Sequence, residues 1–264
     1  MKSISTETRR LPGGERIEIL YLDQASTRNS MTLEMGLSLN QTLHKLAGEL
    51  DAPRALIITG KNGVFSSGGD FNLLRSFAEK EPEENREYMG SFYRLFLAVR
   101  DMPFVVLAAV NGHAVGASLA LALACDFRYL VADARYALNF VRLGIHPGMG
   151  SSFLVKEVAG LAQAQELLFT GRYFSGEEAL RRGLCHGLFP AESILEDTFA
   201  VAAEVARGAP LALRDLKRGL YRSQTLEAAL DHEAQSQADH FASQDFRRAL
   251  AAIEEKKEPQ FEGD

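Results

Sequence analysis

The pattern of apolar and polar positions changes near residue 190. Before that point, apolar runs of strand length alternate with longer segments in which apolar residues recur every three or four positions. The runs predicted as strands are 17–22, 55–59, 104–110, 127–132 and 136–139, and the segments predicted as helices are 31–50, 71–80, 88–100, 116–125 and 151–158. This alternation predicts parallel βαβ units with right-handed crossovers.

Beyond residue 190, no strand-like run remains in the sequence. Segments 195–207, 210–223, 226–241 and 244–257 have the spacing of amphipathic helices. The polar segment 79–87, which contains Pro82, is predicted to be a mobile loop. The sequence therefore predicts an α/β region over 1–190 and a helical region over 191–264.

Composition restricts the class of protein. The chain has 264 residues, of which 46% are hydrophobic, and this fits one large domain or one domain with a small appendage. A formal net charge of −6 argues against nucleic-acid binding, which needs a clustered basic surface. The chain shows neither an apolar signal core at its start nor an apolar run of membrane-spanning length, so we expect a cytoplasmic location and no membrane partner. Because Cys125 and Cys185 stand alone, we expect neither a disulfide framework nor a metal site.

Two loops carry the candidate chemistry. Segments 64–70 (VFSSGGD) and 110–117 (VNGHAVGA) each follow a strand-like run and end in small residues that lead into a helix. This arrangement lets two backbone N–H groups face one point, which is what stabilisation of an oxyanion requires. A glycine-rich turn that only starts a helix is the alternative for either loop taken alone.

The two loops, in this order and spacing, resemble those of the crotonase (enoyl-CoA hydratase/isomerase) superfamily, and the resemblance covers roughly residues 15–262. It implies a crotonase-like spiral of ββα turns over 1–190, followed by a helical C-terminal trimerisation region over 191–264. It also implies that the backbone N–H groups of Ser67 and Ala117 polarise the thioester carbonyl of an acyl-CoA. Ala117 stands where the family usually has glycine, and it keeps its N–H if its φ is negative.

Around these two donors the resemblance places further contacts. Gly68 allows the thioester to approach the backbone closely, and Asp70 lies in the first turn of the next helix. Gly116 begins the helix whose N-terminal dipole points at the thioester oxygen.

The two acid/base glutamates of the family's hydratases are missing. In the alignment they fall on Ala120 and Phe140, and neither side chain can move a proton. In the peroxisomal type of enoyl-CoA isomerase, a glutamate in the turn after Leu-Gly-x-x-Pro shuttles the proton, and Gly148 occupies its place here. A standard two-glutamate hydratase is therefore disfavoured.

His146 is the first candidate for a substitute acid or base, because its ordinary pKa suits proton transfer. A turn histidine without a catalytic role is the alternative. Asn139 and Arg142 flank Phe140, and these three residues could contact the acyl group, although Arg142 could equally be a solvated strand-end charge. A glutamate from the segment 79–84 is another possible source of a carboxylate.

Coenzyme A contacts are implied by the resemblance alone. Ser26 and Arg28 lie in the turn that corresponds to the family's pantetheine- and adenine-binding segment, with Arg28 a candidate for a phosphate. Ser67, Gly68 and Asp70 contribute from the first loop. Phe241 and Lys257 correspond to residues that reach the nucleotide, often across a subunit boundary. We expect no separate cofactor, because coenzyme A enters as part of the thioester substrate.

Two functions remain open. The first is an acyl-CoA enzyme that relies on enolate stabilisation and carries out isomerisation, decarboxylation of a malonyl-type thioester or atypical hydration. The second is a catalytically inactive CoA-binding protein with an interaction or regulatory role. The resemblance implies a homotrimer or a dimer of trimers in either case.

Overall fold

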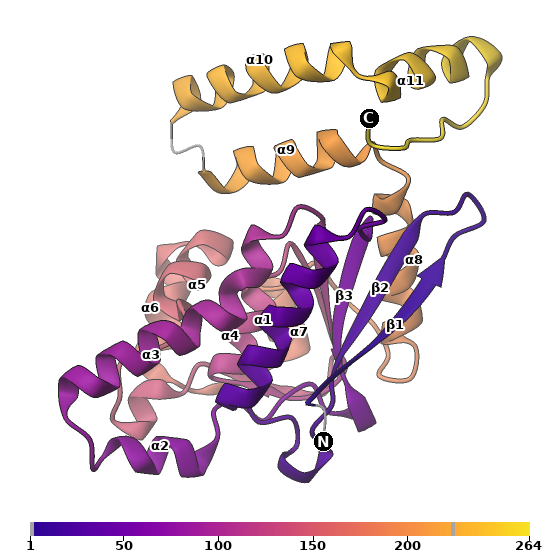
Figure 1. Cartoon of the computed structure of the whole chain (residues 1–264). Coiled ribbons are helices and arrows are strands. Elements are labelled where there is room, and N and C mark those ends of the chain that lie inside the picture. Colours follow the sequence, from indigo (N-terminus) through magenta and orange to yellow (C-terminus); the bar gives the residue numbers. More distant parts are fainter. Residues whose placement is uncertain (1–2, 223–224) are drawn as a thin grey trace.

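A six-stranded sheet forms the centre of the computed structural model, which describes residues 3–222 and 225–264 (Figure 1). Its strands lie in the order β1-β2-β3-β4-β6-β9, and all neighbours are parallel except the edge pair β1–β2. The bounds are Ile4–Arg10 (β1), Arg16–Leu22 (β2), Ala55–Gly60 (β3), Val105–Val110 (β4), Phe127–Leu130 (β6) and Gly187–Leu188 (β9). The prediction of parallel βαβ units is confirmed.

Strand β1 is absent from the sequence prediction. Its sequence, ISTETRR, is mostly polar, and only its first residue, Ile4, is a buried apolar side chain. It pairs antiparallel with β2 over its whole length, from Ile4 opposite Leu22 to Arg10 opposite Arg16. An edge strand with one exposed face needs no apolar run, which explains why apolar periodicity does not reveal it.

Alternate residues of the central strands supply two cores. On β3, Leu56 and Ile58 belong to the larger core, whereas Ile57 faces the smaller core on the other side of the sheet. All three side chains are fully buried. Each such burial contributes roughly 1.5–3 kcal/mol, so the sheet is fixed from both faces.

Helices cover both faces and connect the strands. The bounds are Leu33–Gly48 (α1), Phe71–Phe77 (α2), Pro82–Leu97 (α3), Ala117–Ala124 (α4), Ser151–Ala159 (α5), Leu161–Thr170 (α6), Gly176–Arg181 (α7), Ile194–Ala206 (α8), Pro210–Arg222 (α9), Leu226–Ala242 (α10) and Gln244–Glu255 (α11). Helices α1, α3 and α4 supply the larger core, and α8 supplies the smaller one.

Helix α3 begins six residues before the predicted start at residue 88, inside the segment that we predicted to be a mobile loop. Pro82 is the first helical residue, where its missing N–H and fixed φ are favourable. Glu83 and Glu84 follow in the first turn, near the positive end of the helix dipole. The sequence predicts that Pro82 interrupts helical structure, but it begins α3. The prediction of a mobile loop over 79–87 is therefore wrong.

Among the described residues, a smaller sheet and four short 3-10 turns complete the α/β part. The small sheet has the order β5-β7-β8, with bounds Ala114–Val115 (β5), Arg135–Ala137 (β7) and Tyr173–Ser175 (β8). The 3-10 turns are Ala25–Thr27 (η1), Lys61–Gly63 (η2), Ala98–Asp101 (η3) and Phe140–Leu143 (η4).

Helices α9, α10 and α11 form a separate layer at one end of the sheet, drawn in orange and yellow in Figure 1. By contrast, Ile194, Ala202 and Ala206 of α8 belong to the core on the second face of the sheet. The described part of the chain shows no strand after Leu188, as predicted. The predicted helix 210–223 ends at Arg222 in the structure, and Ser223 lies outside the described residues. Of the helices in the described ranges, none combines the length and the hydropathy needed to cross a membrane.

Candidate active site

The two predicted loops lie at the same edge of the sheet. Strand β3 leads into the segment 61–70 and strand β4 into the segment 111–116. Because β3 and β4 are parallel neighbours, their carboxyl ends meet at one edge, where ligand sites of α/β sheets form. A bridge between Ser66 and Ala114 joins the two loops, with the Ser66 N–H donating to the carbonyl of His113 at 3.5 Å.

The Ser118 side chain fixes the distance between the loops. Its hydroxyl is fully buried, accepts the Val115 N–H at 2.8 Å and lies 3.1 Å from the Ser66 carbonyl, to which it can donate. Both partners are backbone groups of the two site loops. A single small side chain at the start of α4 therefore satisfies polar groups on each loop, which a buried backbone requires.

The first loop passes so close to the second that one position must be glycine. Gly68 has a φ of +91°, and a Cβ there would collide with the carbonyl oxygen of Val115. Gly116, which caps α4, has φ 60° and ψ −120°, a conformation that side chains disfavour. These two glycines let the loops meet above the N-terminus of α4.

A cavity of about 340 Å³ opens beneath this meeting point. Its wall comes from the two loops and from α2, α3, η4 and β8, and its apolar residues include Leu73, Leu74, Phe77, Met89, Phe92, Phe140, Leu143, Ile145 and Met149. The polar side chains in the wall belong to Ser67, Asp70, Tyr93, Asn139, His146 and Tyr173. Within the described residues, no lysine or arginine lines this cavity. Such a lining suits an uncharged acyl group.

Ala117 lies in the cavity wall as the first residue of α4. It is not among the described residues with positive φ, so its methyl group is accommodated without strain. The N–H groups of the first helical turn have no partner four residues back, and their dipole favours negative charge. The Ala117 backbone therefore starts a helix at the cavity wall, with no strain from its methyl group.

Ser67 also lines the cavity, but its N–H is engaged. It donates to the carbonyl of Arg28 at 3.0 Å, and the Ser67 hydroxyl donates to the carbonyl of Thr27 at 3.2 Å. Arg28 and Asn29 both adopt left-handed conformations, with φ of 51° and 55°, which turn this segment against the first loop. The structure thus differs from the expectation that two unoccupied N–H groups face the cavity.

The structure places no carboxylate at either aligned glutamate position. Ala120 is fully buried in the core, and Phe140 forms part of the cavity wall. Asp70 is the acidic residue among the described wall residues, and it caps α2: one carboxylate oxygen accepts the Leu73 N–H at 2.9 Å. Glu79 and the glutamates up to residue 84 are exposed and lie outside the wall.

The three residues around η4 have different positions. Asn139 lines the cavity. His146 is exposed at the cavity wall, and its Nδ1 lies 2.8 Å from the carbonyl oxygen of Pro147. Arg142 points elsewhere, because its Nε donates to the carbonyl of Thr170 at 2.8 Å. Arg142 is therefore not part of the described cavity wall, and its contact with an acyl group stays a prediction.

The residues expected to bind coenzyme A divide into two groups. Ser26 and Arg28 are exposed in or beside η1, adjacent to Ser67. Phe241 packs against Phe246, and Lys257 pairs with Glu255, both in the C-terminal helical layer away from α2 and α3 (Figure 1). Within a single chain, Phe241 and Lys257 do not reach the cavity.

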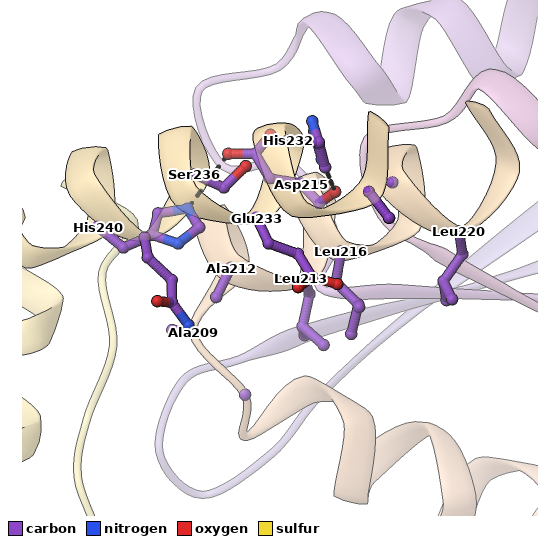
Figure 2. Close-up of a pocket in the computed structure, with 14 residues that line it drawn as sticks. Ala209, Ala212, Leu213, Asp215, Leu216, Leu220, His232, Glu233, Ser236 and His240 are labelled. Atoms are coloured by element: carbon purple, nitrogen blue, oxygen red, sulfur yellow. Dashed lines mark hydrogen bonds and ion pairs between the residues drawn. The ribbon is translucent and has the colours of Figure 1, made fainter. Parts of the chain in front are cut away.

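A larger cavity of about 490 Å³ lies between α9 and α10. Figure 2 shows its mostly apolar wall and the approach of His232 and His240 to Asp215. His232 Nε2 lies 2.8 Å from the Asp215 carbonyl oxygen, and His240 Nε2 lies 3.2 Å from its carboxylate. The Arg214 guanidinium holds the pKa of Asp215 below its usual range. These polar groups satisfy one another, so the surface has the character of a packing face rather than of a catalytic centre.

Tyr93 and Met149 are among the cavity residues that sequence reasoning missed. Tyr93 follows the buried Phe92 on α3, and Met149 is a fully buried, left-handed residue between Gly148 and Gly150. An isolated tyrosine on an amphipathic helix carries no local signal of function. The glycines on either side of Met149 indicate a turn in the sequence, but they do not reveal that Met149 itself is left-handed.

The α/β core, the helical C-terminal layer and the paired loops over an apolar cavity define a crotonase fold. The chain belongs to the enoyl-CoA hydratase/isomerase family, whose model matches residues 14–264. The 2,3-dehydroadipyl-CoA hydratase of Escherichia coli (strain K12) is 30% identical over 257 residues, which cover 94% of this chain and 96% of the relative. The Enoyl-CoA isomerase/hydratase fer4 of Mycosarcoma maydis is 31% identical, with 92% of each chain covered.

Solved structures show the same fold. The crystal structure of an enoyl-CoA hydratase from Bacillus anthracis superposes with a TM-score of 0.90 at 28% sequence identity, and it covers 99% of this chain and 100% of its own. The recognised family and the predicted fold class are confirmed.

Proposed function

We propose that this chain is an acyl-CoA-processing enzyme that stabilises a thioester enolate with the backbone N–H groups of Ser67 and Ala117. The observation that carries the proposal is the shared cavity: the start of α4 and the first loop open onto one apolar pocket. A thioester oxygen held there can accept the negative charge that develops when a proton leaves the α-carbon. Both family glutamates are replaced, by Ala120 and Phe140, so the acid/base groups differ from those of ordinary hydratases.

Among the three candidate reactions, isomerase-type proton transfer has the most support. Decarboxylation of a malonyl-type thioester needs a partner for the departing carboxylate, and the described wall offers no lysine or arginine, with Arg142 bonded to Thr170 instead. Hydration needs a positioned water molecule together with an acid and a base. Moving a double bond within an apolar chain needs only proton transfer next to the enolate.

A CoA-binding protein without turnover is the second candidate. The Ser67 N–H is already bonded to the Arg28 carbonyl, which leaves Ala117 as the accessible donor of the pair. Each oxyanion donor is worth about 2.7–4 kcal/mol of transition-state stabilisation, so a chain that never releases Ser67 would bind thioesters and turn them over poorly.

The decisive experiment removes the Ala117 N–H without breaking the helix. Ala117 is the first residue of α4, a position where proline is tolerated, so Ala117→Pro deletes the donor and keeps the helix start. We expect turnover of 3-hexenoyl-CoA to fall by about 10²–10³-fold in this variant. Ala117→Gly keeps the N–H and is the matched control, with activity close to that of the parent chain.

Two results would contradict the enzymatic proposal. The first is an Ala117→Pro variant that folds, by circular dichroism, and turns the substrate over at the parent rate. The second is a parent chain that binds coenzyme A tightly by calorimetry and leaves crotonyl-CoA, 3-hexenoyl-CoA and methylmalonyl-CoA unchanged by absorbance and by mass spectrometry. Absorbance is needed because isomerisation conjugates the double bond with the thioester without changing the mass. The latter result favours the CoA-binding alternative.

The proposed partner, besides the acyl-CoA, is further copies of the same chain, assembled as a trimer or a dimer of trimers. Exposed apolar side chains on the helical layer support this, among them Leu216 and Leu220 on α9, Leu226 and Leu230 on α10 and Ile253 on α11. Apolar patches of this kind are typical of interaction surfaces. Assembly would also offer Phe241 and Lys257 a nucleotide to contact on a neighbouring copy.

A further inference from the structure

Tyr93 on α3 and Gly148 in the turn after η4 compete for the same space. A Cβ built on Gly148 would overlap the Tyr93 hydroxyl and would lie 3.0 Å from the ring carbon Cζ. Gly148 is the position that aligns with the glutamate of the isomerase turn. Because glycine has no side chain, the phenol hydroxyl of Tyr93 can occupy the space where a side chain at position 148 would begin.

The residue next to Gly148 supports the placement of this hydroxyl. Met149 is fully buried and has a φ of 54°, a left-handed conformation that costs a non-glycine residue of order 1–3 kcal/mol. A backbone hydrogen bond from Met149 stabilises the phenolate form of Tyr93. Strain of this kind is commonly retained where the backbone must point a polar group at a functional atom.

Burial raises the pKa of Tyr93, and the Met149 N–H opposes part of that rise. The sign follows from burial, which penalises the charged phenolate, so the hydroxyl is protonated at neutral pH. Tyr93 is therefore a proton donor rather than a base in the resting cavity.

The other proton-bearing groups in the described wall are less suited to donate inside the cavity. Asp70 is held as the cap of α2, and the Ser67 hydroxyl donates to the Thr27 carbonyl. The side chains of His146 and Tyr173 are exposed. Tyr93, by contrast, is half-buried and lines the same cavity as the apolar side chains of Met89, Phe92 and Phe140.

We propose that Tyr93 is the catalytic acid of this site. The inference rests on the proposed isomerase-type function. In the proposed reaction, the imidazole of His146 first takes the proton from C2 of a 3-enoyl-CoA. The C–H electron pair passes into a dienolate whose charge lies on the thioester oxygen. The Tyr93 O–H bond then breaks as a C–H bond forms at C4, giving the 2-enoyl-CoA, a phenolate and an imidazolium. Water returns the proton from the imidazolium to the phenolate.

This division of labour is testable because Tyr93 acts after C2 has lost its proton. In D2O, Tyr93→Phe should lose isomerisation of 3-hexenoyl-CoA by at least about 100-fold. The recovered 3-hexenoyl-CoA should still gain deuterium at C2, since that exchange needs only the base and the oxyanion donors. Tyr88→Phe is the matched control, because Tyr88 lies on the same helix, packs against Phe77 and Phe92 and is absent from the described cavity wall. It should leave both rates unchanged.

The remaining outcomes separate the two proposals. A Tyr93→Phe variant that isomerises at the parent rate, or one that loses C2 exchange together with isomerisation, overturns the role of Tyr93 as the acid. A parent chain that neither exchanges nor isomerises any of the three CoA thioesters overturns the proposed function, and the assignment of Tyr93 is then lost with it.

Discussion

At Ala117, the group proposed to do the chemistry is a backbone N–H rather than a side chain. Any residue except proline supplies that group, so replacing the usual glycine by alanine leaves the donor in place once φ is negative. The loops could therefore be located from the sequence by their small residues and by the strands before them. The Ser67–Arg28 hydrogen bond could not, since it depends on left-handed conformations at Arg28 and Asn29.

The same limit applies to side chains whose role depends on distant neighbours. Tyr93 and Gly148 are separated by more than fifty residues, and only the packing of α3 against the turn after η4 shows that they exclude one another. Arg142 shows the reverse case. It is adjacent in sequence to a cavity residue and is turned away by the geometry of a 3-10 helix.

The two cysteines give a prediction at this scale. Burial raises the pKa of Cys125 to about 12 and that of Cys185 to about 11, so neither thiol is ionised to a useful extent at neutral pH. Because the thiolate is the nucleophile, both should resist iodoacetamide at pH 8 and begin to react only as the pH approaches 11. Mass spectrometry of the native chain should show no adduct, and the chain unfolded in guanidinium should show two. Rapid labelling of the native protein at pH 8 would contradict the buried placement.

Among the elements, α9 is anchored to the sheet by a buried ion pair. Lys217 Nζ lies 2.8 Å from the Asp126 carboxylate and donates to the Phe104 carbonyl at 3.0 Å. The same carboxylate accepts the Val106 N–H at 2.7 Å and the Tyr221 hydroxyl at 2.7 Å. The helix that leads into the C-terminal layer is thus held at the start of β4.

We expect removal of one partner to be costly. Asp126→Asn leaves the buried Lys217 ammonium without its counter-charge and should lower the free energy of unfolding by about 3–5 kcal/mol. Adding Lys217→Met should recover most of the loss, because an apolar side chain of similar length replaces the stranded charge. Urea denaturation of the parent, both single variants and the double variant measures the coupling. Strictly additive effects would show that the pair does not act as a unit.

The helices and the central strands could be predicted from apolar periodicity, because each of them has a continuous buried face. The exceptions have physical causes that a single sequence hides. Strand β1 is polar because one of its faces is solvated, and α3 starts early because proline at the first helical position is favourable. Each error concerns an element whose stability depends on a partner segment far along the chain.

At the scale of the whole molecule, the layer formed by α9–α11 exposes many large apolar side chains to solvent, which is unfavourable for an isolated chain. Leu216 and Leu220 on α9 are 58% and 72% exposed, and both line the cavity between α9 and α10. Sedimentation equilibrium should give three or six chain masses. Leu216→Glu/Leu220→Glu should shift the protein toward single chains, because buried carboxylates disfavour the interface. Leu50→Glu, at a fully exposed position outside this layer, is the control. A monomeric parent chain would contradict the assembly.

The Ser67 N–H donates to the Arg28 carbonyl, and this hydrogen bond affects how strongly the site binds the thioester substrate compared with the enolate-like transition state. An arriving thioester brings a weak, neutral acceptor, which competes poorly with an amide oxygen already in place. An enolate oxygen is anionic and a far stronger acceptor, so it can displace that amide oxygen. The Ser67 N–H would then bond to the thioester oxygen only as negative charge builds up on that oxygen. The energy of this hydrogen bond would lower the activation barrier and would not strengthen substrate binding.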